Sequence, residues 1–141
     1  MTTRTATAEQ ERDGFTAETF AQFWAKPDLS TPSGDLHDDV IGYWPGTDEP
    51  VRGRDEYVGA LKALLARVPD LTLQVVESAD NGEYLFIRWV AHATGANGRI
   101  EHSGVDRIKV VDGKVAENRI FFDRAEFERK LGISLDLAEA A

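Results

Sequence analysis

Apolar and polar residues alternate with a period of two from Leu71 to Phe122, and this pattern constrains the fold more than any other feature of the chain. The alternation falls into four runs, separated by Asp, Asn and Gly residues that tolerate the positive φ of tight turns. The runs are Leu71–Ala79, Glu83–Thr94, Arg99–Val111 and Lys114–Phe122. They predict four antiparallel strands joined as a meander.

Pairing the runs so that their apolar residues share one face predicts a register for the meander, because a slip by one residue would turn every side chain over. The predicted loops are Asp80–Gly82, Gly95–Gly98 and Asp112–Lys114. The predicted cross-strand pairs are Val75 with Ile87, Leu73 with Trp89, Trp89 with Gly104, Ile87 with Asp106, Asp106 with Ile120, and Gly104 with Phe122. In this register Ala116 also points to the apolar face, and Gly104 leaves room for the Trp89 indole.

The rest of the chain predicts helices and one further strand. Apolar residues at helical spacing predict helices at about Thr16–Ala25, Asp55–Val68 and Arg124–Leu131. Residues 40–44 form a short strand, and residues 26–38 form a loop. Residues 1–14 are interpreted as a flexible tail, residues 15–133 as a single α+β domain, and residues 134–141 as a C-terminal tail. The amphipathic helices are expected to cover the apolar face of the sheet.

Composition excludes several classes of function. The chain has 141 residues with 25 Asp and Glu against 16 Lys and Arg, a net charge of -9. Nucleic acid and anionic membranes are therefore not expected as partners, because both require clustered positive charge. The absence of cysteine excludes disulfides and thiolate chemistry. Without an apolar signal stretch or membrane span, the protein is expected to be soluble and cytoplasmic.

Four polar residues fall on the apolar face of the predicted sheet. Glu77 lies near a strand end and is expected at the rim, whereas His102, Asp106 and Asn118 are more central. An isolated buried carboxylate must be paired, hydrogen-bonded or neutral. No arginine shares the face of Asp106, so its pKa is expected to be raised, as for a proton donor or acceptor. The alternative is a structural anchor, hydrogen-bonded to Tyr43, to the Trp24 indole or to a backbone amide.

His102 and Asn118 have two interpretations of equal weight: they line a pocket, or they are satisfied polar groups of the sheet. The aromatic residues are core by default, and their excess at one end could also form the wall of a ligand site. The candidate substrate-binding residues are Phe20, Trp24, Tyr43, Trp44, Trp89, Asn118, Ile120 and Phe122.

A metal site is not expected. His37, His92 and His102 are placed in a loop and on different faces of the sheet, so we do not expect them to converge on a metal. The outer face carries Arg88, Arg107 and other charges in a cross-strand ladder. Apolar residues interleave with these charges, so this face is also a candidate homodimer interface.

The order of these segments resembles a known family. The helix with FAQFW, the short strand before P-G…G-R-D-E-Y, and the meander ending in GVDRIKVVDGKVAENRIFFD…LG are similar to the SnoaL-like branch of the nuclear transport factor 2-like superfamily. The resemblance implies a cone-shaped, curved antiparallel sheet around a pocket that helices close. It also implies a homodimer that uses no cofactor and no metal.

The resemblance also suggests roles for individual residues. Asp106 matches the position at which ketosteroid isomerases keep a protonated Asp that donates to an oxyanion. Trp44 stands where those isomerases carry the general base. Asp123 resembles the acid/base Asp of polyketide cyclases, with an N-cap of the last helix as the alternative. Ile120 stands where epoxide hydrolases of this superfamily carry an Asp.

Two hypotheses follow. In the first, the protein is an enzyme that isomerises, cyclises or hydrates a hydrophobic, oxygenated molecule by acid/base chemistry, with Asp106, His102 and Asp123 as candidate catalytic residues. In the second, the same pocket binds a small molecule without chemistry, or the outer face recruits a protein partner. The tryptophan at position 44 favours the second hypothesis.

Overall fold

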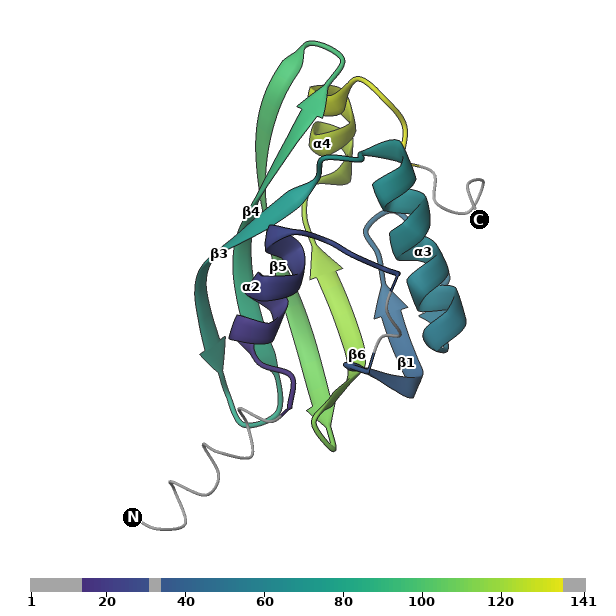
Figure 1. Ribbon diagram of the computed structural model, residues 1–141, viewed down its shortest axis with the longest axis vertical. Coiled ribbons are helices and arrows are strands. Elements are labelled where there is room, and N and C mark those ends of the chain that lie inside the picture. The colour runs from purple at the N-terminus through teal and green to yellow at the C-terminus, as the bar shows by residue number, and fades with distance from the viewer. Residues whose placement is uncertain (1–13, 31–33, 136–141) are drawn as a thin grey trace.

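The computed structural model describes residues 14–30 and 34–135, which form an α+β fold (Figure 1). A six-stranded sheet has the order β2-β1-β6-β5-β4-β3. The strands are β1 (Leu36–Tyr43), β2 (Val51–Arg52), β3 (Thr72–Asp80), β4 (Leu85–Gly95), β5 (Gly98–Val111) and β6 (Lys114–Phe121). The predicted meander is therefore confirmed as β3 to β6. Residues 1–13, most of the predicted flexible tail, lie outside the described residues.

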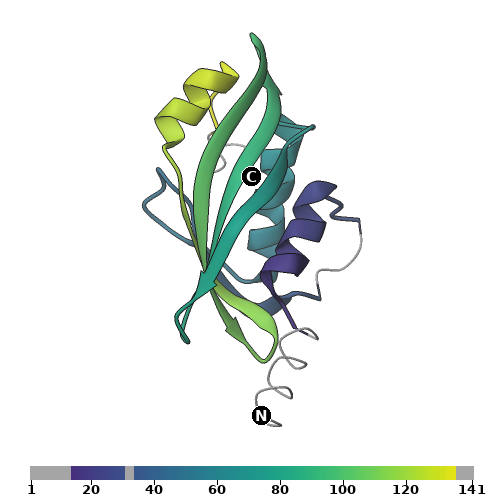
Figure 2. The same cartoon turned by 90° about the vertical axis from the view of Figure 1, so that its left-hand side faces the viewer.

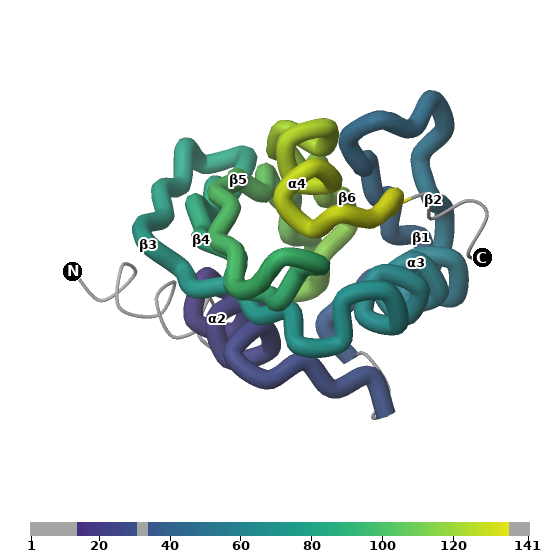
Figure 3. Tube along the Cα trace, turned by 90° about the horizontal axis from the view of Figure 1, so that it is seen from above, coloured from purple at the N-terminus to yellow at the C-terminus, as the bar shows by residue number. Residues whose placement is uncertain are grey.

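The helices are α2 (Ala17–Ala25), α3 (Arg54–Arg67) and α4 (Arg124–Leu131), close to the predicted ranges. Thr16 caps α2 by accepting a hydrogen bond from the Thr19 amide, and Asp123 caps α4 in the same way. Helices α2 and α3 lie on one side of the sheet, and α4 lies across the end near the β4–β5 hairpin (Figure 2, Figure 3). None of the described helices is long and apolar enough to span a membrane.

The central register agrees with the prediction. Trp89 pairs with Gly104, and Asp106 lies between Ile87 on β4 and Ile120 on β6. A Cβ added to Gly104 would lie 2.4 Å from the Trp89 ring, so the glycine does make room for the indole. Correct turn placement in the β4–β5 hairpin accounts for this success.

The predicted register between β3 and β4 is wrong. The hairpin closes at Asp80 and Leu85 around a four-residue turn, which displaces the pairing by three residues from the prediction. A bulge after Val75 then moves the pairing back by one residue, so that Val75 pairs with Trp89 and Leu73 with Ala91. It turns Glu77 to the outer face, where its carboxylate lies 3.1 Å from Arg88.

Two further details of the sheet differ from the prediction. The β5–β6 turn pairs Val111 with Lys114, and a bulge between Lys109 and Val110 in this ladder places Val115, rather than Ala116, on the buried face. Strand β1 begins at Leu36, inside the predicted loop, and pairs with β6 in parallel. The sheet is therefore mixed, because the chain crosses over from β2 through α3 before the meander begins.

The hydrophobic core lies between the inner face of the sheet and the helices. Helix α2 contributes Phe20 and Trp24, and α3 contributes Tyr57 and Leu61. Only three polar residues are buried within the described part of the chain: His102, Asp106 and Asn118. These are the three central residues that the alternation placed on the apolar face.

Candidate functional site

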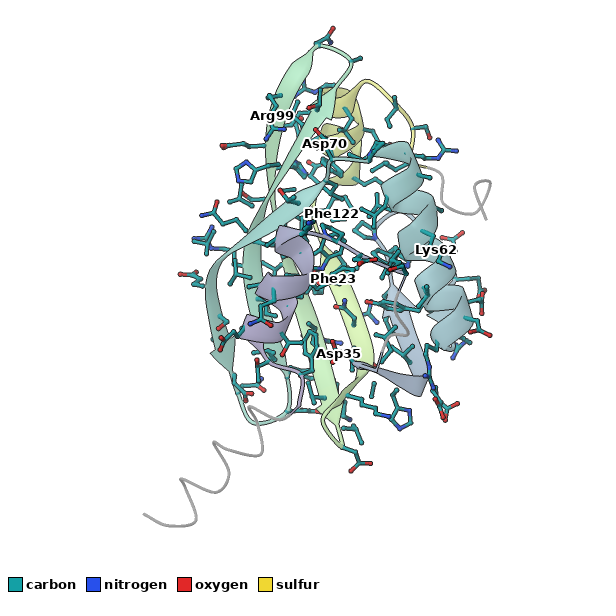
Figure 4. The ribbon with its side chains drawn as sticks, in the orientation of Figure 1. Phe23, Asp35, Lys62, Asp70, Arg99 and Phe122 are labelled. Carbon is teal, nitrogen blue, oxygen red and sulfur yellow. The ribbon has the colours of Figure 1, made fainter. Side chains whose placement is uncertain are left out.

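A cavity lies between the sheet and helices α2 and α3, with a volume of about 130 Å³. Phe23 from α2 and Phe122 after β6 both line it and lie near the centre of the molecule in Figure 4. Most of the lining is aromatic or aliphatic, and polar side chains come from a few positions. Those positions are Asp35, Tyr57, Asp106, Asn118 and Arg124, with the Trp24, Trp44 and Trp89 indoles.

Asp106 lies on the inner face of β5 at this cavity and is only 4% exposed. The Trp89 indole Nε1 donates to Oδ1 at 2.8 Å, and the Asn118 amide Nδ2 donates to Oδ2 at 2.9 Å. Neither donor is charged, and no salt bridge to Asp106 occurs in residues 14–30 and 34–135. The anchoring partners are thus Trp89 and Asn118, in place of the expected Tyr43, Trp24 or backbone amide.

Burial raises the pKa of Asp106 to about 6, because removing a carboxylate from water disfavours its charged form. The hydrogen bonds from Asn118 and Trp89 act in the opposite direction and lower the pKa, but they do not offset burial. A carboxyl group with a pKa near 6 can exchange a proton close to neutral pH, as general acid/base chemistry requires.

Tyr57 is a further polar residue of the site. Tyr57 fits the helical spacing of the apolar residues in α3, but its hydroxyl accepts a hydrogen bond of 2.9 Å from Asn118 Nδ2. The same amide nitrogen donates to Asp106, so the Tyr57 and Asp106 oxygens are no more than about 6 Å apart. Burial and the nearby Asp106 raise the pKa of Tyr57, so the hydroxyl keeps its proton.

The Tyr57 ring packs closely against Gly42 and Trp44, which brings its hydroxyl to the sheet. Gly42 on β1 pairs with Asn118 on β6, and a Cβ at Gly42 would lie 2.7 Å from the Tyr57 ring. The Trp44 ring packs against the Tyr57 ring, with their centroids 5.9 Å apart. Its indole Nε1 is buried without a hydrogen-bond partner.

The structure brings most of the candidate substrate-binding residues to the cavity. Those that line it are Phe20, Trp24, Trp44, Trp89, Asn118, Ile120 and Phe122. Tyr43 is the exception, because it points to the other side of the sheet. There its ring lies 3.9 Å from the guanidinium of Arg119.

His102 and Asp123 do not line the cavity. His102 Nε2 lies 3.0 Å from the Asp123 carbonyl oxygen, and its ring stacks on Phe127 at 4.8 Å. Lys130 Nζ lies 3.2 Å from His102 Nδ1, and desolvation and Lys130 both lower the pKa of His102. The neutral ring therefore joins β5 to α4. The exposed side chain of Asp123 caps α4, so neither residue lies with Asp106.

The family model of SnoaL-like polyketide cyclases matches residues 15–131. The chain belongs to this family. The resemblance seen in the sequence is thereby confirmed, and the match covers the whole sheet and all of the cavity lining except Leu135. Among curated proteins, none matches the sequence.

Solved structures share the fold of this SnoaL-like protein. IdmH, a proposed polyketide cyclase from Streptomyces antibioticus, is 22% identical, with a TM-score of 0.71 over 88% of this chain and 99% of IdmH. An NTF2-like protein from Burkholderia pseudomallei is 19% identical, with a TM-score of 0.69 over 83% of this chain and 98% of the other. A protein with a ketosteroid isomerase-like fold from Catenulispora acidiphila, solved with trimethylamine, is 12% identical, with a TM-score of 0.71 over 83% and 92%.

The outer face of the sheet of this SnoaL-like protein carries the predicted charges. Arg107 pairs with Glu117 at 3.2 Å, and Arg88 pairs with Glu77. Phe121 is 49% exposed on the same face. The homodimer and the cytoplasmic location stay predictions. In the described segments no group of three or more His, Asp or Glu side chains could hold a metal ion.

Proposed function

We propose that this protein is a cofactor-independent acid/base enzyme that isomerises, cyclises or hydrates a hydrophobic, oxygenated small molecule. The observation that carries the proposal is Asp106, a buried carboxyl group at the wall of an apolar cavity, for which the described part of the chain offers no cationic partner. A cavity of this kind, apolar with a few polar groups and a group of perturbed pKa, is the usual form of a small-molecule active site.

In the proposed reaction the Asp106 carboxylate takes a proton from a carbon next to a substrate carbonyl. The electron pair of the broken C–H bond moves to the carbonyl oxygen, which becomes an enolate oxygen. Tyr57 donates a hydrogen bond to that oxygen, since its own hydroxyl accepts from Asn118 and retains its hydrogen for a second partner. Asp106 then returns the proton to a different carbon, which completes an isomerisation.

A cyclisation shares the first step. The enolate carbon attacks a second carbonyl of the same molecule, a C–C bond forms, and the proton on Asp106 passes to the new alkoxide. In both cases one residue removes and returns the proton, so no second carboxylate is needed. A well-placed general base of this type contributes about 10²–10⁴-fold in rate.

Family membership supports a small-molecule role, and the structural neighbour IdmH is itself described as a proposed polyketide cyclase. The proposed substrate class follows from the lining, because aromatic walls favour a ring system and the polar cluster favours a carbonyl. Asp106 and Tyr57 are the catalytic residues of this proposal, with Trp89 and Asn118 as positioning residues. His102 and Asp123 have no role in it, because both lie outside the cavity.

The alternative is a binding protein that holds the same kind of ligand without chemistry. One observation favours it: position 44, where the resemblance places the general base of the isomerases, carries a tryptophan. In that case Asp106 would accept hydrogen bonds from a ligand hydroxyl and would transfer no proton.

Deuterium exchange distinguishes the two functions without knowledge of the natural substrate. Cyclohexanone and acetylacetone are enolisable and small, and proton abstraction in heavy water replaces their C–H by C–D, which proton NMR follows. The enzyme should accelerate this exchange, and Asp106→Asn should slow it by about 10²-fold or more. The surface variant Asp70→Asn is the matched control and should exchange at the wild-type rate. Ketone binding with exchange at the solvent rate would establish the binding protein instead.

A further inference from the structure

The cavity is small for a molecule of more than one ring. Its volume is about 130 Å³. A leucine- and phenylalanine-lined cavity of about 150 Å³ holds one benzene molecule. The walls therefore leave room for one six-membered ring next to Asp106, and the residues that close the cavity decide whether a larger substrate can enter.

One wall comes from the segment after α4, whose last two described residues, Ser134 and Leu135, were assigned to a C-terminal tail from the sequence. Helix α4 ends at Gly132, whose φ of 75° turns the chain back toward the body of the protein. Leu135 then inserts among the core residues, is 2% exposed and lines the cavity. Ser134, next to it, is exposed. The segment Gly132–Leu135 is thus an irregular wall that presents one leucine side chain to the cavity.

Charged side chains hold this wall in place. Glu128 accepts a hydrogen bond of 2.7 Å from the Leu135 amide, and Arg124 donates to the Leu135 carbonyl oxygen at 2.9 Å. Arg67 on α3 donates to the Ser134 carbonyl oxygen at 2.8 Å. Leu135 and Ser134 take part in no strand pairing. All three contacts are made to the backbone, so the side chain at position 135 can change without loss of the contacts that position it.

Arg124 connects this wall to a second one. It also donates a hydrogen bond of 3.1 Å to the carbonyl oxygen of Pro45, which lies next to Trp44 and lines the cavity. The same guanidinium therefore fixes the segment after α4 against the segment after β1. Arg124 therefore fixes the position of Leu135 relative to Pro45.

We infer that Leu135 determines the size of the substrate that this cavity accepts. A shorter side chain at this position extends the cavity and admits a second fused ring, and a longer one excludes even a single ring. The inference rests on the proposed function in one respect, since it takes the cavity to be the substrate site. It goes further in naming the residue that selects between one ring and two.

Binding of benzene and naphthalene tests the inference, because neither molecule has an oxygen and neither depends on Asp106 chemistry. Calorimetry or NMR titration would measure the dissociation constants for wild type, Leu135→Ala and Leu135→Phe. We expect the dissociation constant of Leu135→Ala for naphthalene to be about tenfold lower than that of wild type. Leu135→Phe should lose benzene binding.

Leu131→Ala is the matched control. Leu131 is 1% exposed at the end of α4, but it does not line the cavity. Both alanine variants should lower the unfolding temperature, and only Leu135→Ala should change the ratio of naphthalene to benzene affinity. An equal change of that ratio in Leu131→Ala, or no change in Leu135→Ala, would overturn the inference.

The outcomes separate this inference from the proposed function. If the ratio changes at position 135 while no ketone undergoes exchange, Leu135 sets the size of a ligand and the acid/base proposal fails. If exchange depends on Asp106 but the ratio is unchanged, the acid/base proposal holds and the role of Leu135 is wrong. If neither aromatic probe binds any variant, the role of Leu135 is also wrong.

Discussion

Replacing Asp106 by asparagine should stabilise the protein at neutral pH. The amide is close in shape to the protonated carboxyl group but never ionises. Burial raises the pKa of Asp106 from its ordinary 3.8 to about 6, and each unit of pKa corresponds to about 1.4 kcal/mol. The ionised carboxylate therefore costs the native state about 3 kcal/mol above pH 6, and Asp106→Asn should recover a large part of it.

The sign of the pH dependence follows from the direction of the shift. Below pH 3.8 the carboxyl group is protonated in both the native and the unfolded state, so it contributes no difference. Between pH 3.8 and about 6 the unfolded state ionises first, and the free energy of unfolding falls as the pH rises. Above pH 6 the loss is complete. The stability difference between Asp106→Asn and wild type should therefore grow across this window and stay constant above it.

Urea unfolding at a series of pH values, followed by tryptophan fluorescence, would measure this difference. The other titrating groups are the same in wild type and Asp106→Asn, so their contributions cancel in the difference between the two free energies of unfolding. Asp70→Asn is a control of opposite sign, because hydrogen bonds from Thr94 lower the pKa of Asp70, so that variant should lose stability above pH 4. If Asp106→Asn instead destabilises by about 3–5 kcal/mol at every pH, Asp106 is an ionised structural anchor and the reasoning is refuted.

Three further predictions concern Trp89 on β4 and Gly104 and His102 on β5. Trp89→Phe removes the indole donor that lowers the pKa of Asp106, so carbon NMR of the carboxyl group should give a pKa above 6, and an unchanged value would contradict this account. Gly104→Ala places a Cβ 2.4 Å from the Trp89 ring, and overpacking of this kind should cost about 1–3 kcal/mol in urea unfolding; a neutral effect would show that the indole can move freely. Because the pKa of His102 is lowered, the unfolded state takes up its proton first as the pH falls below 6.5. His102→Phe should therefore lose less stability than wild type between pH 7 and pH 5, and parallel losses would show that His102 titrates normally.

The sequence predicted the fold where local turn chemistry and alternation agree. Gly95 and Gly98 mark the β4–β5 hairpin, and its register places Asp106 beside Ile87 as expected. The β3–β4 register failed because the turn spans residues 81–84 rather than the predicted 80–82, and the bulge after Val75, which the alternation does not reveal, corrects only one residue of this shift. The predicted strand at residues 40–44 begins four residues too late, because the first half of β1 is mostly polar. Long-range parallel pairing with β6 decides its length, and no local pattern reports that pairing.

The candidate site was predictable only in part, for a related reason. Asp106 and Asn118 were found because each breaks an apolar alternation. Tyr57 was missed because it fits the apolar stripe of α3, and its hydroxyl meets Asn118, 61 residues later in the chain. Leu135 comes three residues after Gly132, in a segment where nothing in the sequence distinguishes a tail from a wall of the cavity.

The proposed mechanism gives Asp106 a different role from the one that the resemblance suggests. A carboxyl group that donates to an oxyanion must hold its proton at neutral pH, which requires a pKa well above 7. With a pKa of about 6, Asp106 is about nine-tenths ionised at pH 7. The raised pKa of Tyr57 keeps its hydroxyl protonated in the same conditions. Both groups meet at the Asn118 amide, so the donor function suits Tyr57 and the base function suits Asp106. The proposed chemistry therefore needs no carboxylate at position 44, because its base, Asp106, lies on β5 rather than after β1.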